Sequence, residues 1–113
     1  MPGKIVEINN RVEYKKFISE HKYCIVKVSA GWCGPCQRVK PWFMERFNQM
    51  PDNVHLILVD ADEGDLANGL RVKGIPHIQN VIEETVYEIY PTSDTSVLEK
   101  FFVITEQRSK LHN

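Results

Sequence analysis

Two seven-residue runs constrain the fold of this chain more than any other feature: Tyr23–Ser29 (YCIVKVS) and Val54–Asp60 (VHLILVD). Both are rich in β-branched residues and almost continuously apolar, which is typical of strands buried on both faces of a sheet. A helix is expected between them, from Cys33 to about Gln49, with a kink at Pro41, because proline lacks a backbone donor and crowds the preceding turn. Strands that are joined through a helix are usually parallel, so these two strands and the helix between them are predicted to form a β-α-β unit.

The rest of the sequence predicts further elements on both sides of this unit. They are a strand in Lys4–Ile8, a helix from Asn10 to about His21, a short helix after Asp62 or Glu63, strands Pro76–Ile82 and Thr85–Tyr90 with a turn at Glu83-Glu84, and a helix capped by Asp94. The order βαβαβαββα predicts one α/β domain with parallel strands followed by an antiparallel hairpin. We assign residues 1–107 to this domain and expect 108–113 to form a frayed C-terminal tail.

The charge balance excludes a strong electrostatic attraction to polyanions. Fourteen basic and fifteen acidic side chains give a net charge of −1, so nucleic acid and anionic membrane are not expected partners. No window approaches the about 20 apolar residues of a membrane span. The N-terminal sequence MPGKIVEINN lacks the pattern of a secretory signal, and three cysteines do not suit a secreted disulfide scaffold. We therefore expect a cytoplasmic protein.

The chemistry of the chain centres on Trp32–Cys36 (WCGPC), where a buried strand turns into a helix. A two-residue spacing lets both sulfurs meet within the first helical turn. Cys33 falls at the helix N-terminus, where unpaired N–H groups favour a thiolate, so it is the expected nucleophile. Cys36 lies one turn deeper and is the expected resolving thiol, while Pro35 suits a first turn because its missing N–H is not needed there.

Metal binding is the main alternative for this motif. A closed zinc site needs four ligands, and the remaining cysteine, Cys24, and the four histidines lack suitable spacing. A purely structural disulfide also stays open, although so short a loop constrains the unfolded chain little. The acidic run 60–65 (DADEGD) lacks the ligand spacing of a calcium loop and is interpreted as a solvated helix start. We expect no metal, and Cys24 is interpreted as a core residue.

A resemblance to the thioredoxin family becomes explicit when these segments are combined over about residues 5 to 105. The matching features are WCGPC at 32–36, Pro41, the run Val59-Asp60-Ala61-Asp62, and Ala67, Leu70, Val72, Gly74, Ile75 and Pro76. The resemblance implies a mixed five-stranded central sheet flanked by four helices.

The same resemblance implies how a substrate is held. Pro76 corresponds to a cis proline beside the cysteine pair, and the Ile75 backbone is expected to pair with an extended substrate segment. Trp32, Gly74 and Pro76 are expected to shape the substrate groove. The alternative is that Pro76 is an edge-strand proline without contact to sulfur.

The implied reaction is thiol–disulfide exchange on disulfide-containing proteins. The Gly34-Pro35 dipeptide is typical of the reducing members, so a protein-disulfide reductase is the first hypothesis. No phosphate-binding glycine loop is present, so no bound cofactor is expected and a separate thioredoxin-reductase-like protein would supply the electrons. We expect a monomer. The alternatives are a non-catalytic binding module and a more oxidising oxidase or isomerase.

Lys27 is the main departure from the family pattern, because it stands where thioredoxins carry a buried acid, six residues before Cys33. Leu58 stands where the family often has a lysine. A lone buried ammonium is costly, so Lys27 should deprotonate, reach solvent or pair with a thiolate. Our hypothesis is that Lys27 favours the thiolate at Cys33 or Cys36 and so raises the redox potential. The alternative is that its side chain extends to the surface and has no role.

Three further departures concern the surroundings of the pair. Ser29 replaces a common aromatic residue, Pro91 replaces a common glycine beside the groove, and His77 replaces a common threonine after Pro76. His77 could titrate near neutral pH, but we favour an orientation away from the sulfurs. These changes bear on the range of substrates more than on the chemistry.

Overall fold

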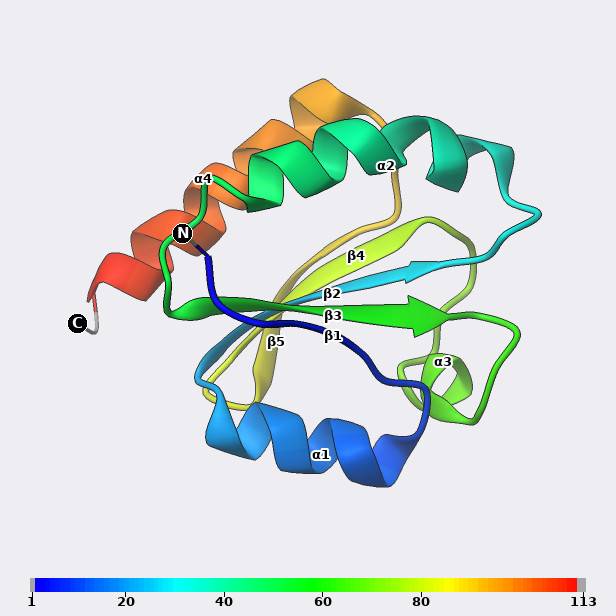
Figure 1. Ribbon diagram of the computed structural model, residues 1–113, viewed down its shortest axis with the longest axis horizontal. Helices are drawn as coiled ribbons and strands as arrows, with labels where there is room; N and C mark the ends of the chain where they lie inside the picture. The colour runs from blue at the N-terminus through cyan, green and yellow to red at the C-terminus, as the bar shows by residue number, and fades with distance from the viewer. Residues whose placement is uncertain (1, 112–113) are drawn as a thin grey trace.

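A five-stranded sheet of order β1-β3-β2-β4-β5 forms the centre of the computed structural model, which describes residues 2–111 (Figure 1). Its strands are β1 (Ile5–Glu7), β2 (Tyr23–Ser29), β3 (Val54–Asp60), β4 (His77–Ile82) and β5 (Thr85–Tyr90). The helices are α1 (Arg11–Glu20), α2 (Gly34–Phe47), α3 (Leu66–Gly69) and α4 (Thr95–Leu111). Helices α2 and α4 cover one face of the sheet, and α1 and α3 lie on the other (Figure 1). The predicted mixed sheet with four helices is confirmed.

Strand β2 holds the central position. It pairs in parallel with β3 and antiparallel with β4, while β1 pairs in parallel with β3 and β5 pairs antiparallel with β4. Every residue of β2 before Ser29 is buried, as expected for a strand covered on both faces. The bounds of β2, β3 and β5 are those expected from the sequence.

Apolar side chains fill both layers between the sheet and the helices. Beneath α2 and α4 the largest are Phe43, Phe47, Phe101 and Phe102, each 0% exposed. Burying one such side chain stabilises a fold by about 1.5–3 kcal/mol. A second cluster on the opposite face includes Tyr14 from α1 and Leu66 from α3. No helix within residues 2–111 combines the length and the apolar character needed to cross a membrane.

Local signals in the sequence set several boundaries. The Asn10 side chain caps α1 by accepting a 2.8 Å hydrogen bond from the backbone N–H of Glu13. Helix α2 begins directly after Cys33 and continues through Pro41 as one helix, so the kink stays a prediction. The turn between β4 and β5 places Glu83 and Glu84 at φ of 52° and 67°, an unusual conformation for residues other than glycine.

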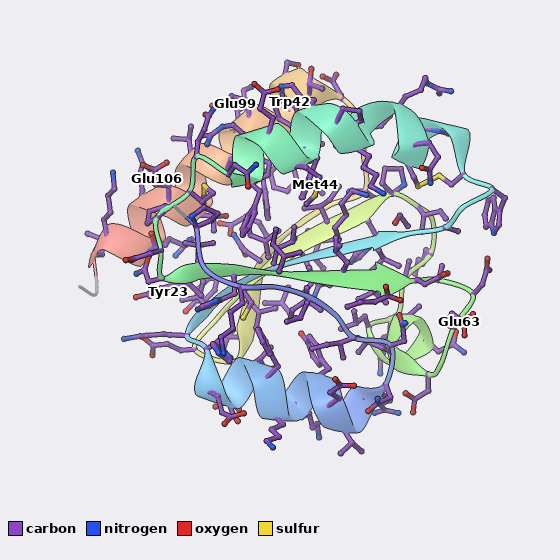
Figure 2. The ribbon with its side chains drawn as sticks, in the orientation of Figure 1. Tyr23, Trp42, Met44, Glu63, Glu99 and Glu106 are labelled. Carbon is purple, nitrogen blue, oxygen red and sulfur yellow. A yellow bond between two sulfur atoms is a disulfide. The ribbon has the colours of Figure 1, made fainter. Side chains whose placement is uncertain are left out.

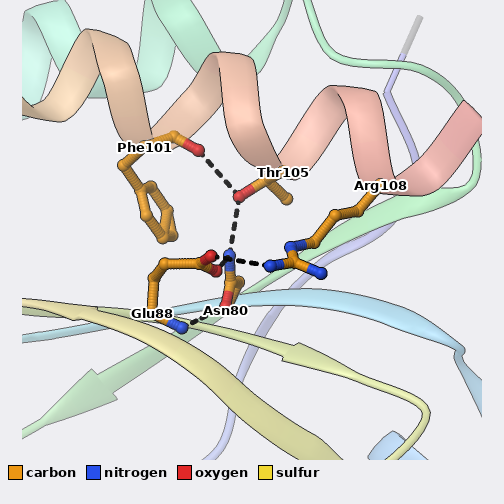
Figure 3. Close-up of polar contacts among 5 residues, drawn as sticks. All are labelled: Asn80, Glu88, Phe101, Thr105 and Arg108. Atoms are coloured by element: carbon orange, nitrogen blue, oxygen red, sulfur yellow. Dashed lines mark hydrogen bonds and ion pairs between the residues drawn. The ribbon is translucent and has the colours of Figure 1, made fainter.

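The expected frayed tail is wrong for residues 108–111, because α4 continues to Leu111. Arg108 donates a 3.1 Å hydrogen bond to Glu88 of β5 (Figure 3). The next residue, Ser109, is 0% exposed. Beside this ion pair, Asn80 of β4 donates to Thr105 of α4 (Figure 3). These contacts with the sheet hold the end of the helix in place. Residues 112 and 113 of the expected tail lie outside the described residues.

Candidate active site

Three segments from distant parts of the sequence meet at one end of the sheet. Ser29 at the end of β2 is the register partner of Asp60 at the end of β3. Val28 pairs with His77, the first residue of the antiparallel strand β4. The loop after β2, the loop after β3 and the residues before β4 therefore lie together. These loops carry most of the site residues expected from the sequence.

The cysteine pair lies where the first of these loops passes into α2, and a yellow sulfur–sulfur bond marks the disulfide in Figure 2. Cys33 is the N-cap of α2 and forms a disulfide with Cys36, with 5.3 Å between the Cα atoms. The backbone N–H of Cys36 donates to Cys33 Sγ at 3.2 Å. Cys33 is 4% exposed and Cys36 is 0% exposed, so the first sulfur is the more accessible. The carbonyl of Ala30 fixes the loop by accepting from Cys33 N at 3.1 Å and from Gln37 Nε2 at 3.0 Å.

The residues before β4 lie against the first cysteine. The Ile75–Pro76 peptide bond is cis, and the carbonyl oxygen of Ile75 lies 3.8 Å from Cys33 Sγ. Ile75 also packs on the cluster formed by Ala30, Cys33 and Cys36. Pro76 itself is buried, whereas Gly74 is exposed, with open space where a side chain would point. Of the other expected groove residues, Pro91 is exposed directly after β5.

Trp32 is the most prominent apolar group at this surface, with 71% of its area exposed. Its indole Nε1 donates a 2.8 Å hydrogen bond to Asp62, and the Asp62 backbone N–H in turn donates to Asp60 at 2.9 Å. The sequence suggested Asp62 only as a helix start, so its contact with Trp32 was missed. The sequence signal that could have pointed to Asp62 as a site residue is its place in the Val59–Asp62 run, one of the features shared with the family.

Lys27 is 3% exposed, which contradicts the alternative in which its side chain extends to the surface. Its Nζ lies 5.6 Å from the centre of the Phe43 ring, and its register partner on β3 is the half-buried Leu58. Burial, and then the nearby charge of Lys40, lower the pKa of Lys27 to about 8. Because this pKa stays above neutral pH, Lys27 keeps most of its charge at pH 7, and its role stays a prediction.

The remaining candidates lie behind or away from the pair. His77 is 5% exposed, with Nε2 2.7 Å from Gln79 Oε1, and Ser29 lines a cavity together with Lys27. Cys24 is fully buried, and burial raises the pKa of its thiol to about 12, as expected for an unreactive core residue. Among residues 2–111, no three His, Cys, Asp or Glu side chains gather closely enough to hold a metal ion.

Comparisons with known proteins agree with this geometry. The sequence model of the Thioredoxin family matches residues 5–102. Thioredoxin-2 of Pyricularia oryzae is 34% identical over 70 residues, which are 61% of this chain and 40% of that protein. Thioredoxin of Oryctolagus cuniculus is 44% identical over 62 residues, which are 51% of this chain and 55% of that protein. The matches thus span about half the length of these relatives.

The fold is shared with solved thioredoxin structures. The thioredoxin of Malassezia sympodialis superimposes with a TM-score of 0.81 at 23% identity, covering 94% of this chain and 95% of that one. The thioredoxin preprotein of Schistosoma mansoni gives 0.80 at 17% identity, covering 91% and 99%. At such low identity these structures establish the thioredoxin fold alone. Since the family's sequence model also matches most of the chain, this protein belongs to the thioredoxin family.

Proposed function

We propose that this chain is a thiol–disulfide oxidoreductase that reduces disulfides in other proteins through Cys33 and Cys36. The single observation that carries the proposal is the disulfide between these residues at the N-terminus of α2, beside the exposed Trp32. Two sulfurs in this position can pass between the dithiol and the disulfide. Membership of the thioredoxin family supports the same activity.

The reaction starts from the dithiol form. The Cys33 thiolate attacks one sulfur of a substrate disulfide, which forms a mixed disulfide and releases the other substrate sulfur as a thiolate. Cys36 gives its proton to solvent and attacks Cys33 Sγ. The Cys33–Cys36 bond forms and the second substrate sulfur leaves as a thiolate. Two electrons have then passed to the substrate, and the two released thiolates take up protons from solvent.

The start of α2 favours the thiolate at Cys33. The Cys36 N–H that contacts Cys33 Sγ at 3.2 Å is one of the unpaired donors of a helix N-terminus, where the helix dipole also favours negative charge. Lys27 is proposed to act in the same direction, because its buried side chain lines the same cavity as Ala30, which packs with both cysteines. Stabilising a thiolate stabilises the reduced form and raises the potential, by about 30 mV for each 1.4 kcal/mol.

The substrate binds as an extended segment beside the pair. Its backbone pairs with Ile75, whose carbonyl faces Cys33, and its side chains contact Trp32 and Pro91. Gly74 keeps this approach open, because nothing lies within 4 Å of where its Cβ would stand. The supporting residues are Gly34 and Pro35 between the cysteines and Pro76 beneath them.

A separate thioredoxin-reductase-like protein returns the oxidised pair to the dithiol, and no cofactor is bound. With this activity the chain carries electrons in cellular redox homeostasis. The monomeric state and the cytoplasmic location stay predictions. Light scattering and fractionation of the source cells respectively test them.

The decisive experiment is the reduction of insulin by dithiothreitol with and without the protein. The parent and the control variant Cys24→Ser should accelerate the reaction equally, and Cys33→Ser should abolish the acceleration. Cys36→Ser should accumulate the mixed disulfide with the substrate. A non-catalytic binding module would leave the rate unchanged and keep its partner affinity in Cys33→Ser. A lysine that stabilises a thiolate would make the protein more oxidising, so the measured redox potential separates a reductase from an oxidase or isomerase.

A further inference from the structure

A cavity of about 330 Å³ lies between the start of α2 and the first three strands of the sheet. Its volume is at the lower end of the roughly 300–1,000 Å³ of small-molecule sites. Met44 projects from α2 toward the sheet and forms part of the wall (Figure 2). The polar and charged lining consists of Glu7 from β1, Lys27 and Ser29 from β2, Asp60 from β3, and Gln37 and Lys40 from α2.

Lys27 is the unusual member of this lining, because it is almost completely buried and forms no ion pair with an acid in the described part of the chain. Within residues 2–111, no carboxylate lies within 4 Å of its Nζ, which instead lies 5.6 Å from the centre of the Phe43 ring. An aromatic face compensates a buried ammonium only in part. Lys40 adds a second positive charge to the same cavity and likewise forms no ion pair among these residues.

The two acids of the cavity are engaged elsewhere. Glu7 accepts a 3.0 Å hydrogen bond from the side chain of Asn9, and Asp60 accepts a 2.9 Å hydrogen bond from the backbone of Asp62. The amide of Gln37 donates to the Ala30 carbonyl. The Ser29 hydroxyl is left as a further donor close to Lys27, on the same face of β2.

We propose that this cavity binds a small oxyanion between Lys27 and Lys40, with the Ser29 hydroxyl as a third donor. The anion supplies the charge partner that Lys27 lacks among residues 2–111. Charge-assisted hydrogen bonds of this kind are about twice as strong as neutral ones. Neither cysteine and none of the expected groove residues lines this cavity. The proposed anion site therefore does not depend on the proposed redox activity.

Titration with sodium sulfate at pH 7 tests the site, because sulfate keeps its charge over the whole pH range used. Amide chemical shifts are followed by NMR at constant ionic strength set with sodium chloride. The expected result is a saturable shift at residues 27–31 and 37–40. Raising the pH to 9.5 should weaken binding several-fold, because Lys27 then loses its proton while facing Lys40, Glu7 and Asp60.

Four variants assign the binding to the two lysines. Lys27→Met should weaken sulfate binding at least about tenfold, which corresponds to the loss of one interaction of about 1.4 kcal/mol. Lys27→Arg should keep it, and Lys40→Gln, at an exposed position, should weaken it about threefold. The matched control is Lys16→Met, which removes the same charge from α1 on the opposite face of the sheet.

Two results would overturn the proposal. One is a linear, unsaturated response of the parent protein to sulfate. The other is equal affinity in Lys27→Met and Lys16→Met. Because binding is read without a redox assay, failure of this site leaves the insulin experiment unaffected, and loss of reductase activity leaves the sulfate experiment unaffected.

Discussion

The indole nitrogen of Trp32 and the carboxylate of Asp62 form a 2.8 Å hydrogen bond that joins the loop after β2 to the loop after β3. Trp32 directly precedes Cys33, and most of its ring is exposed. The bond therefore fixes the orientation of a large apolar surface next to the proposed nucleophile. Without it, an exposed indole would sample several rotamers.

Removal of this hydrogen bond should impair the reduction of protein substrates more than it affects stability. In Asp62→Ala the indole must be ordered when substrate binds, at a cost of about 1 kcal/mol, or about fivefold in kcat/KM for insulin. Asp62→Asn keeps an acceptor for the indole N–H, so its kcat/KM for insulin should lie between the values of Asp62→Ala and the parent. The control is Glu63→Ala, which removes the neighbouring exposed acid at the tip of the same loop (Figure 2). Equal rates for Asp62→Ala and Glu63→Ala would contradict this role.

Replacement of Lys27 should stabilise the oxidised protein at neutral pH. Burial lowers the pKa of Lys27 from 10.5 to about 8, so below pH 8 the folded state carries a full desolvation penalty. Between pH 8 and 10.5 the unfolded chain binds more protons than the folded one, and the penalty fades as pH rises. Lys27→Met should therefore raise the free energy of unfolding by about 3 kcal/mol at pH 7, and by progressively less toward pH 10.5.

Urea denaturation of both proteins across this pH range measures the difference. The free energies of unfolding of parent and variant must be compared at each pH, because the parent alone also responds to other groups. The raised pKa values of Cys24 and Tyr14, both about 12, destabilise the fold above about pH 9 in parent and variant alike. Lys40→Met, at an exposed position, is the control and should change stability little. A constant difference between parent and Lys27→Met from pH 7 to 10.5 would show that Lys27 keeps an ordinary pKa.

The redox potential should depend on the charge at position 27. Exchange of Lys27 for Asp replaces a charge that stabilises thiolates with one that destabilises them, so the potential should fall by about 30 mV for each 1.4 kcal/mol of lost stabilisation. Equilibration of parent and variant with glutathione buffers at pH 7 gives both values. An unchanged or higher potential in Lys27→Asp would reject the hypothesis, whether or not either protein reduces insulin.

Much of this site could be predicted from the sequence because its signals are local. The WCGPC motif lies directly after a buried strand, so the helix N-terminus and the sulfur spacing follow from neighbouring residues. The same holds for β2 and β3, whose continuous apolar character arises from being covered on both faces.

The parts that could not be predicted depend on register between distant segments. The Trp32–Asp62 contact needs the pairing of Ser29 with Asp60. The cavity beside Lys27 needs residues of three strands and α2 to align. The length of α4 depends on Arg108 meeting Glu88, a residue of the antiparallel edge strand. Sequence patterns carry no information on which of several polar residues will become neighbours in this way.

The polar contacts between β4, β5 and α4 should contribute strongly to stability and not to activity. Asn80 is 0% exposed; its Oδ1 accepts from the backbone of Glu88 at 2.8 Å, and its Nδ2 donates to Thr105 Oγ1 at 3.0 Å (Figure 3). Asn80→Ala leaves a backbone N–H without its partner and opens a small cavity, which together should cost about 2–4 kcal/mol of the free energy of unfolding.

Thr105→Val keeps the shape of the side chain and loses its hydrogen bonds, so a loss of about 1 kcal/mol is expected. Gln107→Ala, exposed on the same helix, should be neutral in urea denaturation. A loss below about 0.5 kcal/mol in Asn80→Ala, the range of ordinary surface substitutions, would mean that these contacts do not hold α4 on the sheet.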